Sequence, residues 1–98
     1  MMIHIALTTG EPAGIGPEIS VRAASQFLDQ YDDVLIHLIG DKSLLNSSNE
    51  RLIIEHQALS KPVKAGELNV ENAKYVISTL DHAIDGCIAG TYDAMVTA

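Results

Sequence analysis

Short apolar runs bounded by turn residues recur along the chain, and they predict four strands. Ile3–Thr8 is apolar with a β-branched residue at each end, and Gly10 ends it. Val34–Ile39 is apolar with almost no alternation, which is typical of a strand covered on both faces. Two further runs, Leu52–His56 and Ala94–Thr97, are expected to form the remaining strands.

A helix is expected after the first strand. Pro17 suits a first helical position, where a missing N–H costs nothing, and apolar residues follow it at helical spacing. The face that these residues form should be the inner one, while Arg22, Ser25 and Gln26 point outward. The expected inner face comprises Ile19, Ala23 and Phe27, with Ala24 and Leu28 beside them.

The clearest helix is expected over residues 69–89. Asn69 is a plausible N-cap, and Gly90 is a natural residue to end the helix. Gly86 lies inside it and lowers its helix propensity. We expect part of its apolar stripe to pack on a parallel sheet that contains the first two strands, namely Ala73, Ile77, Leu80, Ile84 and Ile88. The whole stripe comprises these residues with Val70, Val76, Ala83 and Cys87.

Charge and composition narrow the function classes. The 98 residues are 47% hydrophobic and carry a formal net charge of −7, with six basic residues. This composition suits a folded chain but provides no basic surface for nucleic acid or an anionic membrane. An anionic ligand would therefore have to be held by backbone N–H groups or by basic residues outside this stretch. The single cysteine, Cys87, excludes an internal disulfide and is expected to be a buried apolar residue.

The sequence also bears on location. It contains no apolar run near the roughly 20 residues that span a bilayer. Its first residues lack the charged flank and long apolar stretch of a signal peptide. We therefore expect a cytoplasmic protein with no membrane partner.

The most informative segment for chemistry is the glycine-rich turn between the first strand and the first helix. Gly10, Gly14 and Gly16 permit positive φ and let a ligand approach the backbone closely. Free N–H groups in the first helical turn, together with the helix dipole, favour a negative or polar group at this place. These three glycines and Glu11 are therefore candidate cofactor-binding residues.

The same turn has features that oppose phosphate binding. Its spacing is neither G-x-G-x-x-G nor a Walker A loop, because no Lys follows the glycines. Glu11 and Glu18 would repel a phosphate placed beside them. Two interpretations stay open: a ligand-binding loop, or a tight turn whose glycines serve packing alone. Glu11 is the better functional candidate, facing a cofactor or a cation, whereas Glu18 suits the helix N-terminus.

The four histidines do not suggest a metal site. No pair has helical metal-ligand spacing, and Cys87 is not suitably placed to join them. His4, His37 and His56 fall in predicted strands, where a hydrogen-bonded structural imidazole is expected. His82 falls on the polar side of the long helix and is expected to be solvated. We therefore predict no catalytic and no metal-binding residue in this segment.

Three stretches resemble one enzyme family. Gly10–Glu18 is similar to the N-terminal signature of the 4-hydroxythreonine-4-phosphate dehydrogenases. Residues 65–76 resemble the segment that opens the long helix in that family, and Tyr92–Ala98 resembles the strand after it. The matches follow the family's order and spacing over nearly the whole chain. One departure is Thr9, where a Pro or Met is often found.

The resemblance implies a fold. Family members are much longer and fold as two α/β/α lobes, akin to the isocitrate and isopropylmalate dehydrogenases, with the active site between the lobes and across a dimer. The fold class expected here is α/β, and residues 1–98 would be the N-terminal part of the first three-layer lobe. The remainder of the enzyme would lie beyond residue 98.

The resemblance also implies a reaction. The family oxidises 4-phosphooxy-L-threonine with NAD or NADP and a divalent metal (Zn, Mg or Co), and the product loses carbon dioxide on the route to pyridoxal phosphate. The metal ligands and main phosphate-binding residues would lie outside this segment, so the segment alone should be inactive. The implied partners are a small phosphorylated amino acid and, at full length, a second subunit.

Two alternatives remain at this point. The parent enzyme could be a paralogue that acts on a related phosphorylated acid, such as phospho-threonate or phospho-erythronate, because the substrate-contacting residues lie elsewhere. The chain could instead be a stand-alone, non-catalytic α/β module that binds an anion at the glycine-rich turn. Its length permits this, but the exposed apolar face of a lone half-lobe argues against it.

Overall fold

The four strands form one parallel sheet. The computed structural model describes residues 1–47, 49–59, 61–64, 66–67 and 69–98. Within them, β1 (Ile3–Thr8) pairs with β2 (Val34–Gly40) on one side and with β4 (Ala94–Thr97) on the other, and β3 (Leu52–His56) pairs with β2. The sheet order is therefore β3-β2-β1-β4. The predicted strands are confirmed, with β2 one residue longer than expected.

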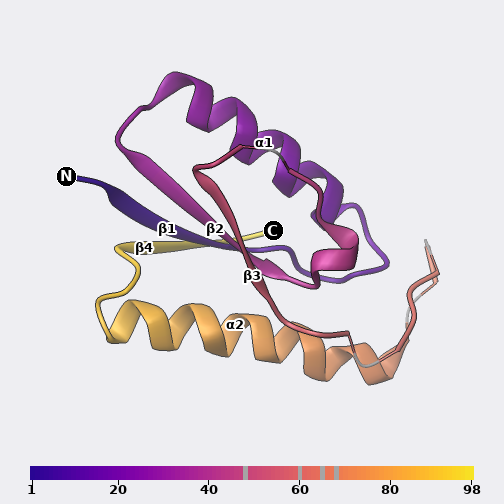
Figure 1. Cartoon of the computed structure of the whole chain (residues 1–98). Coiled ribbons are helices and arrows are strands. Elements are labelled where there is room, and N and C mark those ends of the chain that lie inside the picture. Colours follow the sequence, from indigo (N-terminus) through magenta and orange to yellow (C-terminus); the bar gives the residue numbers. More distant parts are fainter. Residues whose placement is uncertain (48, 60, 65, 68) are drawn as a thin grey trace.

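Two helices cover opposite faces of the sheet, so the chain has three layers (Figure 1). α1 (Gly16–Gln30) covers one face, and α2 (Ala73–Ile88) runs along the other. Two short 3₁₀ helices, η1 (Lys42–Leu44) and η2 (Val70–Asn72), follow side-chain caps from Asp41 and Asn69. No helix of the described residues is long and apolar enough to cross a membrane.

α1 buries a different line of residues from the one predicted. Ile19 and Phe27 are exposed, and Ala23 is exposed beside them. The helix lies mainly over β2, whose apolar side chains form the main core with Ala24 and Leu28. Its buried residues are Pro17, Ser20, Ala24 and Leu28. The expected burial of Ala24 and Leu28 is confirmed, whereas that of Ile19, Ala23 and Phe27 was wrong. α1 lies mainly over β2, and Phe27 borders an open apolar hollow with Val96.

The expected packing of α2 was also wrong in part. Ile77 and Ile84 are exposed, whereas Tyr75, Thr79 and Ala83 are buried against the sheet. Of the five stripe residues expected to pack on the sheet, Ala73, Ile77, Ile84 and Ile88 are exposed, while Leu80 is half-buried. Sequence periodicity could not identify the inner face, because a Tyr and a Thr hold it in place of large aliphatic residues.

Specific contacts explain why α2 turns this face inward. The Tyr75 hydroxyl accepts a hydrogen bond from the Asp41 N–H (2.9 Å), in the buried loop that follows β2. Ala83 contacts Ala6 and Ile39 in a second core cluster, which Tyr92 completes. The small side chain at Ala83 lets the helix approach the sheet closely. Cys87, predicted to be buried, is half-buried at the edge of this cluster.

Gly86 has a structural role that its helix propensity does not suggest. A Cβ at this position would overlap the ring of Tyr92, which is 4% exposed. The helix ends as predicted, since Gly90 has φ +80° and the N–H groups of Thr91 and Tyr92 both donate to the Gly86 carbonyl. The absence of a side chain at Gly86 therefore leaves room for the Tyr92 ring, which links α2 to the start of β4.

Arg51 closes the C-terminal end of α1. Its guanidinium donates hydrogen bonds to the carbonyls of Leu28 (2.6 Å), Tyr31 (2.6 Å) and Val34 (3.0 Å). The last turn of α1 has no basic residue of its own. A residue just before β3 thus supplies the positive charge and the donors that this helix end requires.

We predict that Gly86→Ala destabilises the fold by about 1–3 kcal/mol, because the added methyl group overpacks a filled site. Helix propensity alone predicts the opposite sign, a gain of roughly 1 kcal/mol. Urea denaturation of the two proteins measures the difference. Gln26→Ala on the exposed side of α1 is the matched control and should leave the transition midpoint nearly unchanged. An increase in stability for Gly86→Ala would show that Tyr92 does not depend on this glycine.

Candidate functional site

The candidate site lies where the parallel strands end. The carboxyl ends of β1, β2 and β4 meet at one edge of the sheet, and ligands of open α/β sheets bind at this kind of edge. The loop from Thr9 to Ile15 leaves β1 here and leads into α1. Thr9 itself is fully buried, and the Ala98 N–H donates to the Thr8 carbonyl (3.0 Å) beside it.

Two of the three glycines of the turn are required by packing. Gly10 has φ +75°, and a Cβ on it would lie 2.6 Å from the Ala98 carbonyl oxygen. A Cβ on Gly16 would overlap the Thr9 carbonyl oxygen. At both positions, backbone atoms occupy the space that a side chain would need. Gly10 and Gly16 therefore allow the loop and the start of α1 to pack against the sheet edge.

Gly14 is the glycine that remains open. It is exposed, and the nearest atom to a Cβ built on it is the Glu11 carbonyl oxygen at 3.4 Å, an ordinary contact distance. Its N–H donates to the same carbonyl (3.1 Å), which closes a tight turn. Of the candidate glycines, Gly14 is therefore the one whose backbone a ligand could reach.

The two carboxylates of the turn differ in setting. Glu11 is half-buried, and its Oε1 accepts a hydrogen bond from the Ala13 N–H (3.2 Å), so its carboxylate helps to shape the loop. Glu18 is exposed in the first turn of α1, where it suits the helix dipole as predicted. The helix has no side-chain cap, because Ile15 occupies the N-cap position.

A hollow of about 250 Å³ lies beside this turn. The loop after β3 closes one side of it, since the Gly66 N–H donates to the Ala13 carbonyl (3.0 Å). Its lining is mainly apolar, with one carboxylate from Glu18. Such a surface suits an apolar or neutral portion of a ligand better than a multiply charged phosphate. The lining residues are Pro12, Ala13, Gly14, Pro17, Glu18, Leu44 and Val63.

Asp41 organises the neighbouring loops. Its carboxylate accepts hydrogen bonds from the N–H groups of Ser43 (2.8 Å) and Leu59 (2.8 Å). Burial by itself raises the pKa of Asp41, but these bonds and nearby His56 outweigh that effect and lower the pKa below its ordinary value of 3.8. Asp41 therefore ties the loops after β2 and β3 together as a carboxylate.

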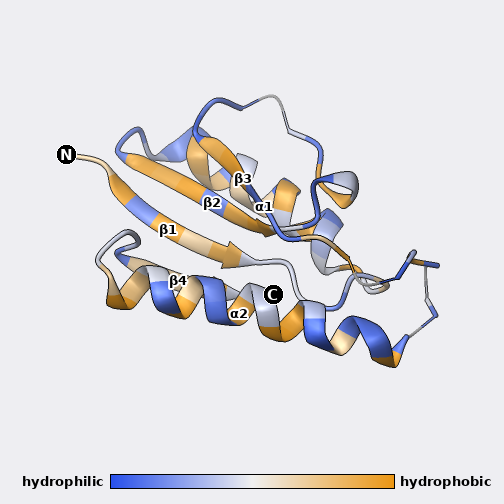
Figure 2. Cartoon of the chain, turned by 60° about the horizontal axis from the view of Figure 1, so that its bottom comes forward, coloured by the Kyte–Doolittle hydropathy of each residue, from blue (hydrophilic) through white to orange (hydrophobic). Residues whose placement is uncertain are grey.

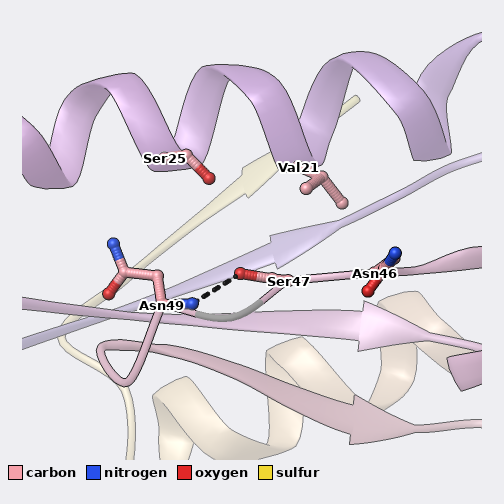
Figure 3. A pocket seen from close by; sticks show the side chains of 5 residues that line it. All are labelled: Val21, Ser25, Asn46, Ser47 and Asn49. Carbon is pink, nitrogen blue, oxygen red and sulfur yellow. Dashed lines mark hydrogen bonds between the residues drawn. The ribbon is translucent and has the colours of Figure 1, made fainter.

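A larger polar hollow of about 520 Å³ lies between α1 and the loop before β3 (Figure 3). Ser25 and Val21 border it from the helix, and Asn46 borders it from the loop. The Asn49 N–H donates to the Ser47 hydroxyl (3.1 Å) at its wall. None of these five side chains is charged, so they offer hydrogen-bond donors and acceptors but no ionisable acid or base.

Three of the histidines have the structural roles that were expected. His37 is buried between His4 (2.9 Å) and the Glu55 carboxylate (3.1 Å). An ionised Glu55 only accepts, so His37 Nδ1 donates to it, and His37 Nε2 accepts from His4 Nδ1. His56 Nδ1 accepts from the Lys42 N–H (3.0 Å).

His82 differs from the expectation. It is half-buried rather than solvated, because its Nε2 lies 3.1 Å from the Tyr92 hydroxyl. Burial, together with the nearby Glu55 and Cys87, raises the pKa of Tyr92, so the phenol keeps its proton. Within the part of the chain that the structure describes, no three His, Cys, Asp or Glu side chains are grouped to hold a metal ion.

Comparison with known proteins identifies the relatives. No family model matches the chain. The 4-hydroxythreonine-4-phosphate dehydrogenase of Burkholderia vietnamiensis is 40% identical over 108 residues, and that of Ralstonia nicotianae is 43% identical over 119 residues. These matches take in 98% and 99% of this chain. The chain is homologous to part of the 4-hydroxythreonine-4-phosphate dehydrogenases. It spans 33% and 35% of the two relatives' lengths.

Solved structures confirm the fold of the chain. A 4-hydroxythreonine-4-phosphate dehydrogenase from Klebsiella pneumoniae superposes with a TM-score of 0.80 at 22% identity. A structure from Salmonella typhimurium, described as the same enzyme, gives 0.79 at 22% identity. The matches cover 98–99% of this chain and 37% of each structure. The α/β fold expected from the resemblance, as the N-terminal part of a larger one, is confirmed.

We predict opposite outcomes for two alanine substitutions in the turn. Gly16→Ala forces a methyl group against the Thr9 backbone carbonyl and should cost about 2 kcal/mol or more. Gly14→Ala has space for the same methyl group and should change stability by less than about 0.5 kcal/mol. Thermal unfolding of both variants measures this. Equal losses would contradict the assignment of Gly14 as the open position.

A pH prediction follows from Asp41. A lowered folded-state pKa stabilises the fold above the ordinary value of 3.8, and this contribution is lost as pH falls through the folded-state pKa. Asp41→Asn should cost about 1–3 kcal/mol at neutral pH, and the gap to the parent should narrow as pH falls below 3.8. Urea unfolding across this range tests it, with exposed Asp32→Asn as control. A gap that is constant with pH would contradict the prediction.

Proposed function

We propose that residues 1–98 form the N-terminal part of the first lobe of an NAD(P)-dependent dehydrogenase that oxidises 4-phosphooxy-L-threonine. The observation that carries the proposal is the identity of 40% and 43% to enzymes of that name over nearly the whole chain. On this proposal the remaining part of the enzyme supplies the second lobe, and the complete protein acts as a homodimer in pyridoxal phosphate biosynthesis.

The geometry of the turn supports a role in receiving the cofactor. Gly14 presents an open backbone at the N-terminus of α1, beside a mainly apolar hollow. We assign this surface to an uncharged portion of the dinucleotide, because the Glu18 carboxylate opposes a phosphate there. NAD or NADP, when bound, accepts the hydride. This segment contributes shape: Gly10 and Gly16 hold the loop, and Glu11 braces it through the Ala13 N–H.

The divalent metal of the proposed reaction does not fit the described residues. His37 and Glu55 already satisfy each other, and His4 is committed to His37. His56 accepts from the Lys42 N–H, and His82 Nε2 is hydrogen-bonded to the Tyr92 hydroxyl. The metal ligands and the residues that bind the substrate phosphate are therefore assigned to the rest of the enzyme, and no chemical step is assigned to this segment.

Assay of the complete protein tests the proposal. We expect NADH or NADPH production from 4-phosphooxy-L-threonine in the presence of a divalent metal, and none from the isolated 98-residue chain. Gly14→Val in the complete protein should raise the KM for the dinucleotide about tenfold or more with an unchanged melting temperature, because the side chain fills the open backbone position.

Each arm of the assay has a distinct meaning. Turnover of phospho-threonate or phospho-erythronate but not of 4-phosphooxy-L-threonine would replace the proposed substrate with that of a paralogue. An unchanged KM for Gly14→Val would remove the turn from the cofactor site while leaving the dehydrogenase assignment intact. Dinucleotide reduction by the isolated chain would contradict the proposal that the catalytic residues lie in the rest of the enzyme.

A further inference from the structure

Hydrogen bonds between titratable side chains cross three strands on the face of the sheet that α2 covers, visible as the lower helix in Figure 2. His37 of β2 lies at their centre and is 7% exposed. Its Nε2 lies 2.9 Å from Nδ1 of His4 on β1, and its Nδ1 lies 3.1 Å from Oε1 of Glu55 on β3. We call this set the His4–His37–Glu55 network. No chemical step is assigned to it, but its imidazoles change charge with pH.

The short distance between the two imidazoles limits how many protons they hold together. One of the two facing nitrogens must donate and the other must accept, so the 2.9 Å contact has room for one hydrogen atom. A first added proton fits, because it can occupy Nε2 of His4, which this contact does not use. A second would point an N–H of His4 at an N–H of His37 and break the contact.

The folded pair therefore binds fewer protons in acid than the same two residues bind in the unfolded chain. Unfolded histidines each take up a proton near roughly pH 6.5, whereas the folded pair has room for one in total. Stability falls with pH wherever the unfolded state binds more protons. A difference of one proton changes the folding equilibrium about tenfold per pH unit.

The other titratable groups around the pair do not make room for the second proton. The Asp93 carboxylate accepts the His4 backbone N–H through Oδ2 (2.8 Å). Negative charge nearby balances one imidazolium, but it does not separate two rings whose backbones are held by the pairing of β1 with β2. The surrounding groups are Glu55 on β3, His82, Asp85 and Cys87 on α2, and Tyr92 and Asp93 before β4.

Tyr92 connects this network to α2. Its ring lies against His37, with 4.9 Å between the ring centroids, and fills the space that Gly86 leaves on the helix. We propose that the His4–His37–Glu55 network makes the attachment of α2 to the sheet pH-sensitive. The network is intact with at most one added proton on the two imidazoles, and it opens when the second binds. This inference does not depend on the proposed dehydrogenase activity.

Hydrogen exchange of the complete protein, followed by mass spectrometry from about pH 8 to about pH 5, tests the proposal. After correction for the intrinsic pH dependence of exchange, peptides from the C-terminal half of α2 should lose protection below roughly pH 6.5. The loss should reach about tenfold per pH unit. Peptides of α1, on the opposite face of the sheet, should keep their protection. Unchanged protection of α2, or an equal loss in α1, would overturn the proposal.

His4→Gln identifies the groups responsible. Glutamine keeps a donor and an acceptor at this place but takes up no proton, so α2 should keep its protection in acid. His56→Gln is the matched control, because this histidine is exposed and lies outside the network, and this variant should lose protection as the parent does. An equal acid loss in the parent and in His4→Gln would assign the effect to other groups and contradict the proposal.

Histidine-selective 15N NMR of the complete parent protein needs no variant. Scalar coupling between ring nitrogens across the N–H···N bond identifies the signals of His4 and His37. We expect one imidazolium in this pair while the coupling persists, and loss of the coupling when the second forms. Two imidazolium rings in a protein whose α2 is still fully protected would show that the contact does not limit proton binding.

Discussion

Close backbone packing at the carboxyl edge of the sheet is the constraint on which the rest of the structure depends. Gly16 lies against the Thr9 carbonyl, and Gly10, at φ +75°, lies against Ala98. These contacts bring the start of α1 up to the end of β1 and bring β4 alongside it. The direction of α1, the hollow beside Pro12 and Pro17, and the open position of Gly14 all follow from this packing. A side chain at either closed glycine would separate elements that the sheet edge requires to touch.

Buried polar groups then set the positions of the loops and of α2. The Asp41 carboxylate joins the loops after β2 and β3, and its backbone N–H donates to Tyr75 on α2. On the same face of the sheet, Tyr92 lies over Gly86 and His37 is bonded at both ring nitrogens. Because buried polar groups need partners, these bonds restrict the rotation of α2 about its axis and its distance from the sheet more narrowly than apolar contacts alone.

The two faces of α2 serve different purposes. The inner face carries Tyr75, Thr79 and Ala83, all buried: the Tyr75 hydroxyl accepts from the Asp41 N–H after β2, Ala83 packs against Ala6 and Ile39, and the Thr79 hydroxyl donates to the Val76 carbonyl within the helix. The outer face carries exposed aliphatic residues three and four positions apart, including Ile77 and Ile84. A helix with polar or small residues inward and aliphatic residues outward is suited to a position between a sheet and a further packing layer.

The sequence by itself determined the four strands, the end of α2 at Gly90 and the resemblance to one enzyme family. Ile3–Thr8 and Leu52–His56 match the structure residue for residue, because apolar runs and turn residues are local signals. The rotation of α1 and α2 was decided only in the tertiary structure. Periodicity ranks faces by hydrophobicity, whereas the inner face of α2 is set by the hydrogen bond between Tyr75 and the Asp41 N–H, by the close packing of Ala83, and by the space that Gly86 leaves for Tyr92. The distinction among the three turn glycines was likewise decided there. A Cβ on Gly10 or Gly16 would collide with the backbone of Ala98 or Thr9, whereas a Cβ on Gly14 would lie at an ordinary 3.4 Å from the Glu11 carbonyl oxygen.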